Sequence, residues 1–299
     1  MPVAFFGSYS CQPRLYQGFY EVSLILNAVS QVVNTFFDCL CLIWERLCDM
    51  LRNMEYFFVF DHHLPQGVGI GWMGGVHIGW LLFAALAIFG LCRACRRADA
   101  PRFRFLQRAV CAGILVTEVV RELCLLSAGV WGVYTLPLHL CSLSVFVVLW
   151  HTLRGNALSG ELLYCLGMPG AAMALLFPDW LYYPAANLMS INSFLGHILL
   201  TAYPAMLTAR GAIVPDVKRL PKCFACLAAT SAVIFVFDKL TNSNYFFLNS
   251  PSPGSPLVFF ERWLGNPGFI VGYLPLIAAL WLLLYLPWVL VRRLRRPAG

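Results

Sequence analysis

Long apolar runs follow one another from about residue 70 to the C-terminus, and they constrain the fold more than any other feature. A helix crosses the hydrocarbon core of a bilayer in about 20 residues, and each run is long enough to do so. Strands of a membrane barrel are shorter and alternate in polarity. The sequence therefore predicts an all-α polytopic membrane helix bundle with seven spans. The predicted spans are 70–92, 109–131, 133–153, 158–177, 190–209, 223–241 and 267–291.

The composition supports lipid as the solvent for much of the surface. Hydrophobic residues make up 60% of the 299 positions and charged residues 12%, whereas about a quarter of an ordinary soluble domain is charged. The net charge of +7 does not indicate a nucleic-acid partner, because most Arg residues sit in short blocks between the apolar runs. We expect membrane lipids, and no nucleic acid, as partners.

The basic residues predict the orientation of the spans. They gather at 93–108, at 154, at 210–222 and after 291, which all lie on one side if there are seven spans. The opposite segments, 132, 178–189 and 242–266, contain only Arg262. The positive-inside rule then places the C-terminus in the cytoplasm of a cell-membrane protein. On the outer side, an interfacial aromatic belt is predicted from Trp180, Tyr182, Tyr183 and Trp263.

The N-terminal region is predicted to differ from the rest of the chain. Residues 1–53 form an extension that precedes a seven-span domain at 54–299. Within the extension, residues 20–44 are predicted to form an amphipathic helix, with a polar stripe on an apolar cylinder. We favour a helix that does not span the membrane, and an eighth span remains the alternative. The stripe consists of Asn27, Gln31, Asn34, Asp38 and Glu45.

Ionisable residues inside the predicted spans indicate a functional layer. His77, His139 and His197 each lie six or seven residues from the outer end of a span, which is roughly 10 Å deep at the helical rise. Arg121 and Glu122 lie about 14 Å deep on the same estimate. Such groups are costly in hydrocarbon and face a bundle interior or a cavity. We therefore expect three imidazoles from separate helices to meet in the outer half of the bilayer.

Glu118, Arg121 and Glu122 lie at helical spacings of three and four, on one face. An Arg flanked in this way can be neutralised within its own helix, as a structural charge cluster. Alternatively, its forked donors bind an anionic head group such as phosphate. The sequence leaves both interpretations open.

Cys141 and His139 lie in the segment LPLHLCSLS. Two residues correspond to a rotation of about 200° around a helix, so these side chains are not expected to pair directly. A pairing of Cys141 with His197 from another helix is geometrically easier.

Three segments, LPLHLCSLS, GMPGAAMALLFPD and GHILLTAYPAML, together with NYFFL at 244–248, resemble the YwaF family of bacterial integral membrane proteins over about residues 54–291. That family is similar to a vertebrate transmembrane acyltransferase that moves polyunsaturated acyl chains onto ether lysophospholipids by Cys and His chemistry. The resemblance implies a bacterial plasma membrane, and it implies that His197 matches the family's His. The vertebrate segment P-C-H-L has Leu138 here in place of its Cys, and Cys141 lies one turn further on.

We therefore predict a lipid-modifying enzyme that transfers or hydrolyses acyl chains of a phospholipid or lysophospholipid, without a cofactor or metal ion. One alternative is a zinc-dependent hydrolase that uses His77, His139, His197 and Asp238. Another is a transporter or proton-coupled carrier. The oligomeric state is not determined by the sequence. The predicted catalytic residues are Cys141, His197 and His139, and the predicted substrate-binding residues are His77, Glu118, Arg121, Glu122, Asn244 and Tyr245.

Overall fold

The computed structural model describes residues 31, 35, 38, 54–60, 63–252 and 254–294. The chain divides into two units, Met1–Met54 and Glu55–Gly299. In the first unit, the described residues 31, 35 and 38 are helical, and Thr35 Oγ1 donates to the carbonyl oxygen of Gln31. The remainder of the predicted amphipathic helix at 20–44 lies outside the described residues.

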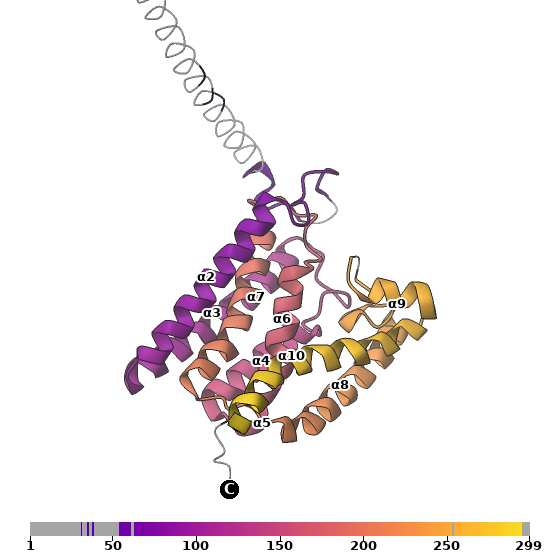
Figure 1. The fold of residues 1–299 in the computed structure, drawn as a ribbon. Helices are drawn as coiled ribbons and strands as arrows, with labels where there is room; N and C mark the ends of the chain where they lie inside the picture. Colours follow the sequence, from indigo (N-terminus) through magenta and orange to yellow (C-terminus); the bar gives the residue numbers. More distant parts are fainter. Residues whose placement is uncertain are drawn as a thin grey trace, which may run out of the picture. The chain divides into compact units, whose positions relative to one another are not determined.

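Helices build the second unit, and no strand occurs among its described residues (Figure 1). The long helices are α2 (Gly75–Arg97), α3 (Ala100–Ser127), α4 (Leu140–Arg154), α7 (Leu188–Arg210), α8 (Leu220–Thr241) and α10 (Tyr273–Leu294). The short elements are η1 (Met54–Tyr56), α5 (Ala157–Leu162), η3 (Leu163–Gly167), α6 (Met168–Leu176), η4 (Val217–Arg219), η5 (Tyr245–Phe247), α9 (Leu257–Leu264) and η6 (Gly268–Gly272).

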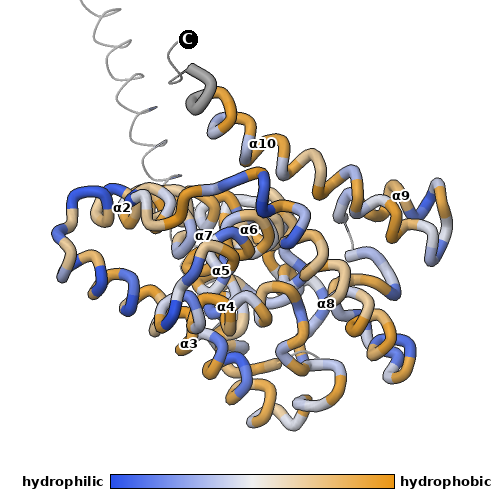
Figure 2. The backbone as a smooth tube through the Cα atoms, turned by 90° about the horizontal axis from the view of Figure 1, so that it is seen from below, coloured by the Kyte–Doolittle hydropathy of each residue, from blue (hydrophilic) through white to orange (hydrophobic). Residues whose placement is uncertain are grey.

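Four stretches of the described chain are long and apolar enough to cross a membrane. They are Gly75–Arg97, Ala157–Leu176, Val217–Thr241 and Gly268–Leu290, and they correspond to predicted spans one, four, six and seven. The end of α2 and the start of α3 carry hydrophilic residues, which are blue in Figure 2. The protein is thus an all-helical membrane protein, and four of the seven predicted spans are supported by length and composition.

Helices α3, α4 and α7 fall on the other three predicted spans but lack that apolar length. Helix α3 contains Glu118, Arg121 and Glu122, and α4 has only 15 residues. Helix α7 packs against α2, α3 and α6 and buries Ser190, Asn192 and Thr201. Because neighbouring helices cover so much of α7, its surface does not need the apolar residues that a lipid-facing helix requires.

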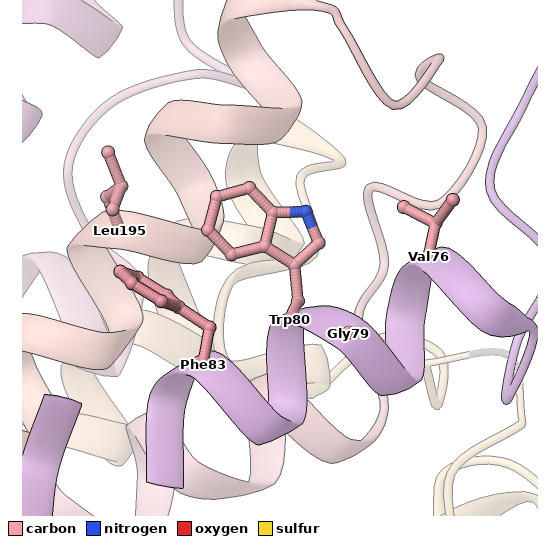
Figure 3. Close-up of a pocket in the computed structure, with 5 residues that line it drawn as sticks. All are labelled: Val76, Gly79, Trp80, Phe83 and Leu195. Atoms are coloured by element: carbon pink, nitrogen blue, oxygen red, sulfur yellow. The ribbon is translucent and has the colours of Figure 1, made fainter. Parts of the chain in front are cut away.

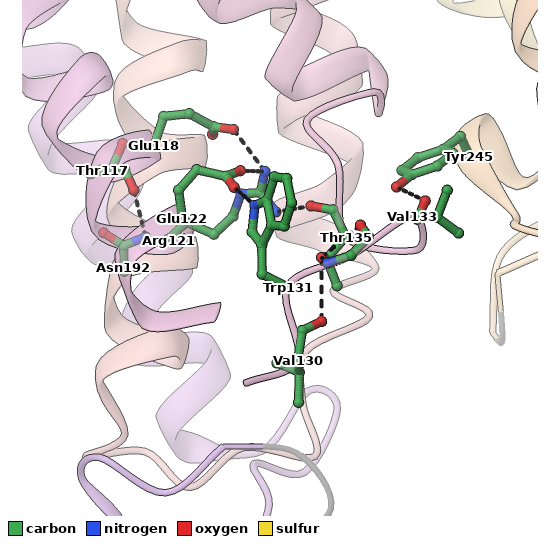
Figure 4. Close-up of polar contacts among 11 residues, drawn as sticks. Thr117, Glu118, Arg121, Glu122, Val130, Trp131, Val133, Thr135, Asn192 and Tyr245 are labelled. Carbon is green, nitrogen blue, oxygen red and sulfur yellow. Dashed lines mark hydrogen bonds and ion pairs between the residues drawn. The ribbon is translucent and has the colours of Figure 1, made fainter. Parts of the chain in front are cut away.

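The predicted helix at 133–153 begins later in the structure, at Leu140. Residues 129–139 form turns and irregular chain, because a proline at 137 disfavours helical geometry in the residue before it. Their carbonyl groups find partners on other elements: Tyr245 Oη donates to Val133 O at 2.9 Å, and Arg121 Nη1 donates to Thr135 O at 3.3 Å (Figure 4). Irregular backbone at membrane depth is tolerated where protein satisfies it in this way.

Side chains of α10 reach across to the helical stretch 157–176. Its central turn, η3, is a π-helix, and Trp281 Nε1 donates to the Cys165 carbonyl oxygen at 2.9 Å. Tyr164 Oη donates to Leu284 O at 3.0 Å and accepts from Trp288 Nε1 at 3.0 Å. Long aromatic side chains therefore fix α10 in place.

Glu161 anchors the end of the bundle that carries the Arg-rich segments 93–108 and 210–222, which we call the basic end. Its side chain is buried, and its oxygens accept from Asp216 N at 3.1 Å, from Arg219 Nη1 at 2.9 Å and from Tyr285 Oη. One carboxylate thereby joins α5, η4 and α10. The opposite end of the bundle, with segments 128–139, 177–187 and 242–256, is called the loop end.

Candidate functional site

The loop end contains an ionic cluster around Arg121 (Figure 4). Arg121 Nη2 contacts Glu118 at 2.9 Å and also contacts Glu122. Glu122 accepts a further bond from Trp131 Nε1 at 2.7 Å. Two carboxylates therefore face one guanidinium, and the cluster carries a net negative charge when all three groups are ionised.

This arrangement is the structural charge cluster that the helical spacing allowed. Because Arg121 Nη1 also donates to Thr135 O, the guanidinium ties α3 to the irregular segment before α4. Of the three guanidinium nitrogens of Arg121, Nε is the one that has no partner among the described residues. A phosphate group on Arg121 would have to approach two carboxylates, and it would be repelled by both.

His139 is the N-cap residue of α4, and its ring is covered by the loop after α8. The ring centroid lies 5.0 Å from that of Tyr245 and 5.5 Å from that of Phe247. His139 also interacts electrostatically with Asp179, Arg121, Asp238 and His197. His197 is the weakest of these four influences on His139, and no ring contact or hydrogen bond joins the two imidazoles within the described part of the chain.

Asp238 holds the loop that covers His139. Its side chain is fully buried, and Oδ1 accepts from Ser243 Oγ at 2.6 Å and from Tyr245 N at 3.0 Å. Asn244 is used inside the same loop, where its Oδ1 accepts from the backbone of Asn249 and its Nδ2 donates to Ser250. Asn244 therefore shapes the loop, whereas Tyr245 presents its ring to His139.

His197 has a defined tautomer in this structure. Its Nδ1 lies 2.7 Å from the carbonyl oxygen of Ser193, and a carbonyl can only accept, so the proton is on Nδ1. Nε2 of the neutral ring is then a free acceptor, which a general base requires. The side chain is half-buried.

Cys141 lies in the first turn of α4 and is also half-buried. Asp179 and Glu118 interact electrostatically both with Cys141 and with His197, so the thiol and the imidazole share a neighbourhood. No hydrogen bond joins Cys141 to His197 within the described part of the chain. We call His139, Cys141, Asp179 and His197 the His–Cys site.

A series of stacked aromatic rings lines one side of this site. The ring of Trp180 stacks on that of His197 with centroids 4.7 Å apart. It also packs edge-to-face with the ring of Phe194, with centroids 5.3 Å apart. Trp180 and Tyr183 are buried, with 6% and 4% of their surfaces exposed. They are therefore not part of the predicted lipid-facing belt, whereas Tyr182 and Trp263 are exposed.

His77 lies on the far side of these rings. Its centroid is 6.1 Å from that of Phe194, and Phe194 and Trp180 stand between it and His197. Both ring nitrogens are engaged: Nδ1 accepts from Met73 N at 3.1 Å, and Nε2 lies 2.8 Å from Leu175 O. His77 is fully buried and joins α2 to the end of α6 as a structural residue.

An apolar depression opens on the surface between α2 and α7 (Figure 3). Trp80 forms part of its wall and stacks on Phe194 with centroids 4.9 Å apart. The aromatic series Trp80, Phe194 and Trp180 thus runs from this surface to His197. The residues that line the depression are Val76, Gly79, Trp80, Phe83 and Leu195.

The geometry does not assemble the zinc site that was considered from the sequence. The described residues contain no group of three His, Cys, Asp or Glu side chains placed to hold a metal ion. His77 could not ligate without giving up a backbone hydrogen bond.

Asp179, which belongs to the His–Cys site, and Trp180, which stacks on His197, were not predicted as site residues. They follow the segment ALLFP, at the start of a loop that a hydropathy profile places outside the spans. The loop turns back because Leu181 O accepts from Ile70 N at 2.7 Å. The presence of an acid and an indole directly after a predicted span was the available signal, since both are suited to a polar site.

Comparison with known proteins identifies the family of the chain. No curated protein and no solved structure matches the chain. The model of the TMEM164 family matches residues 72–285, which cover α2 to α9 and the first part of α10 and include every residue of the His–Cys site. The match does not confirm the YwaF name given to the resemblance above. Because it spans well over half of the sequence, the chain belongs to the TMEM164 family.

Proposed function

We propose that the protein is a membrane enzyme that transfers or hydrolyses acyl chains of phospholipids at its loop end. The observation that carries the proposal is the state of His197. Its Nδ1–H is committed to Ser193 O, its Nε2 is free to accept a proton, and Asp179 interacts with it electrostatically. An imidazole oriented by one hydrogen bond and supported by a carboxylate is suited to general-base catalysis.

Cys141 is the proposed nucleophile. It lies in the first turn of α4, where backbone N–H groups lack helical partners, and its thiol must pass its proton to a base as the sulfur attacks. It shares Asp179 and Glu118 with His197 as electrostatic neighbours. A small rearrangement or a bridging water is needed to connect the thiol to Nε2, which is common for catalytic hydrogen bonds before substrate binds.

In the proposed reaction, the thiol proton moves to His197 Nε2 and the sulfur attacks the ester carbonyl carbon. The carbon–oxygen bond to the lipid backbone breaks, and the imidazolium returns the proton to the leaving oxygen, which releases a lysophospholipid and an acyl thioester. The hydroxyl of an acceptor lysophospholipid, or water, then attacks the thioester with His197 again taking the proton. The thiol is regenerated when that proton returns to sulfur.

Asp179 and Glu118 stabilise the imidazolium that forms in each half of this reaction. The ionic cluster of Arg121 keeps the segment before α4 in place through Thr135 O, and the Asp238 loop covers His139 with Tyr245. His139 is proposed to donate a hydrogen bond to the reacting lipid.

The distribution of basic residues supports the orientation. We place the basic end and the C-terminus in the cytoplasm and the His–Cys site in the outer half of the cell membrane. Protease accessibility of a C-terminal tag in sealed vesicles of known orientation tests this placement.

The function is tested with the purified full chain in liposomes of phospholipid that carries a labelled acyl chain. We expect labelled acyl chains to be transferred to added lysophospholipid or released. Cys141→Ala and His197→Gln should each lower the rate by at least about 100-fold, since proton transfer alone contributes that much.

Matched controls are Cys226→Ala, an exposed thiol, and His151→Gln, an imidazole at the basic end. Both should retain wild-type turnover. If Cys141→Ala keeps full turnover, the cysteine has no role. If the wild-type protein moves no acyl chain from any phospholipid tested, the proposed function is wrong.

A further inference from the structure

Trp180 carries a buried hydrogen-bond donor that its fold does not use. Only 6% of its surface is exposed, and no group among the described residues accepts from its Nε1–H. Buried polar groups in proteins nearly always have a partner, so an exception calls for an explanation. An unpaired donor beside a reaction centre is often one that a ligand pairs.

The other indoles of the chain whose hydrogen bonds are known show the contrast. Trp72 donates to Leu176 O at 3.0 Å and Trp131 to Glu122 at 2.7 Å. Trp281 donates to Cys165 O at 2.9 Å and Trp288 to Tyr164 Oη at 3.0 Å. These four indole N–H groups are paired although their side chains are more exposed than that of Trp180.

The donor lies beside the proposed base. The indole of Trp180 stacks on the imidazole of His197 with centroids 4.7 Å apart and an angle of 20° between the ring planes. An acceptor bonded to Nε1 lies in the plane of the indole, at the edge of the ring that stacks on the imidazole. A purely packing role would need only an aromatic ring, which Phe supplies without a buried donor.

The charge around the donor selects the kind of acceptor. Asp179 precedes Trp180 and, with Glu118, interacts electrostatically with His197. Glu122 adds a third carboxylate to the ionic cluster, against the single positive charge of Arg121. A phosphate oxygen would meet this negative charge, whereas a neutral carbonyl oxygen would not.

We propose that Trp180 Nε1–H is a substrate-binding donor that holds the ester carbonyl oxygen of a lipid next to His197. This inference rests on the proposed function for the identity of the ligand. It assigns Trp180 a contact with substrate, and it predicts that the site distinguishes ester-linked from ether-linked chains before any chemistry occurs.

Trp180→Phe tests the inference because it keeps the stacked ring and removes the N–H. The matched control is Trp80→Phe, which changes another ring of the same aromatic series, stacked on Phe194. All measurements use the full chain in nanodiscs, in a Cys141→Ala background so that no turnover interferes. The two probes are 1-palmitoyl-lysophosphatidylcholine and its 1-O-hexadecyl ether analogue, which share the phosphate and differ in the carbonyl.

We expect the parent protein to bind the ester about tenfold more tightly than the ether, which corresponds to one hydrogen bond of about 1.4 kcal/mol. Trp180→Phe should abolish this preference. Trp80→Phe should retain the preference. A preference that survives Trp180→Phe, or a parent protein that binds ester and ether equally or binds neither, would overturn the inference.

The outcomes are separable from those of the proposed function. If the protein shows an ester preference that depends on Trp180 but no acyl turnover, Trp180 keeps its binding role and the proposed enzymatic activity is wrong.

Discussion

Replacing Glu161 by Gln tests whether the basic end is held together by one buried carboxylate. Glu161 accepts hydrogen bonds from Arg219, from Tyr285 and from the backbone N–H of Asp216. Gln keeps the size of the side chain and one acceptor oxygen. The NH₂ group of Gln takes the place of the other carboxylate oxygen, and an NH₂ group cannot accept a hydrogen bond from the donors that face it. At least one of the three hydrogen bonds is therefore lost.

The expected cost follows from the exposure of the partners. A hydrogen bond to a charged group contributes about 1.5–3 kcal/mol, and two side-chain donors share this carboxylate. The side chain of Arg219 is 34% exposed, so it can turn to solvent when its bond to Glu161 is lost. The cost of losing that bond therefore lies at the low end of this range. We expect Glu161→Gln to lower the free energy of unfolding by about 2–4 kcal/mol.

The assay is reversible unfolding in mixed detergent micelles, combined with Tyr285→Phe in a double-mutant cycle. If the two side chains share one hydrogen bond, their effects should be less than additive by about 1–2 kcal/mol. Tyr134→Phe, at a tyrosine with 66% exposure, is the control and should change stability by less than about 0.5 kcal/mol. Additive effects, or a Glu161→Gln protein as stable as wild type, would refute the reasoning.

Three further predictions concern the loop end. His77→Leu removes the partners of Met73 N and Leu175 O and should lower the free energy of unfolding by about 2–4 kcal/mol without changing the KM for lipid; a changed KM at normal stability would return His77 to the substrate site. Asp179→Asn should lower kcat about tenfold at constant KM and stability, because Asp179 is exposed, and Asp179→Glu should retain most of kcat; equal losses in both variants would contradict an electrostatic role. Burial raises the pKa of Tyr245 to about 12, against about 10 in an unfolded chain. Since the unfolded state loses this proton first, stability should fall as the pH rises from about 10 towards 12, and Tyr245→Phe should lose this part of the pH dependence of unfolding.

The apolar runs were sufficient to predict most helices because a lipid-facing helix must be apolar along its length. The stretches Gly75–Arg97 and Val217–Thr241 carry this signal clearly. Helix α7 carries it weakly, since protein rather than lipid covers most of its surface. Pro137 is a local signal for the delayed start of α4. The hydrogen bonds from Tyr245 and Arg121 that hold the preceding segment come from distant parts of the chain, and no local sequence pattern indicates them.

The sequence predicted how deep in the bilayer the candidate site residues lie, but not the direction in which their side chains point. Counting residues from the ends of the spans placed three imidazoles in one layer, and only an electrostatic influence of His197 on His139 links any two of them. The rotation of each helix about its axis also decides where a side chain points, and it turns His77 towards the end of α6. Asp179 and Trp180 were missed because a loop's path depends on distant contacts, here Ile70 N with Leu181 O.

The irregular segment before α4 has a consequence for how freely its sequence can vary. Tyr245 and Arg121 contact it through the carbonyl oxygens of Val133 and Thr135, and a carbonyl is the same in every amino acid. Substitutions at Val133 that preserve the backbone path should therefore be tolerated, while the distant Tyr245 and Arg121 should not be replaceable. A saturation mutagenesis scan should therefore find that Val133 accepts many side chains, whereas Tyr245 and Arg121 do not.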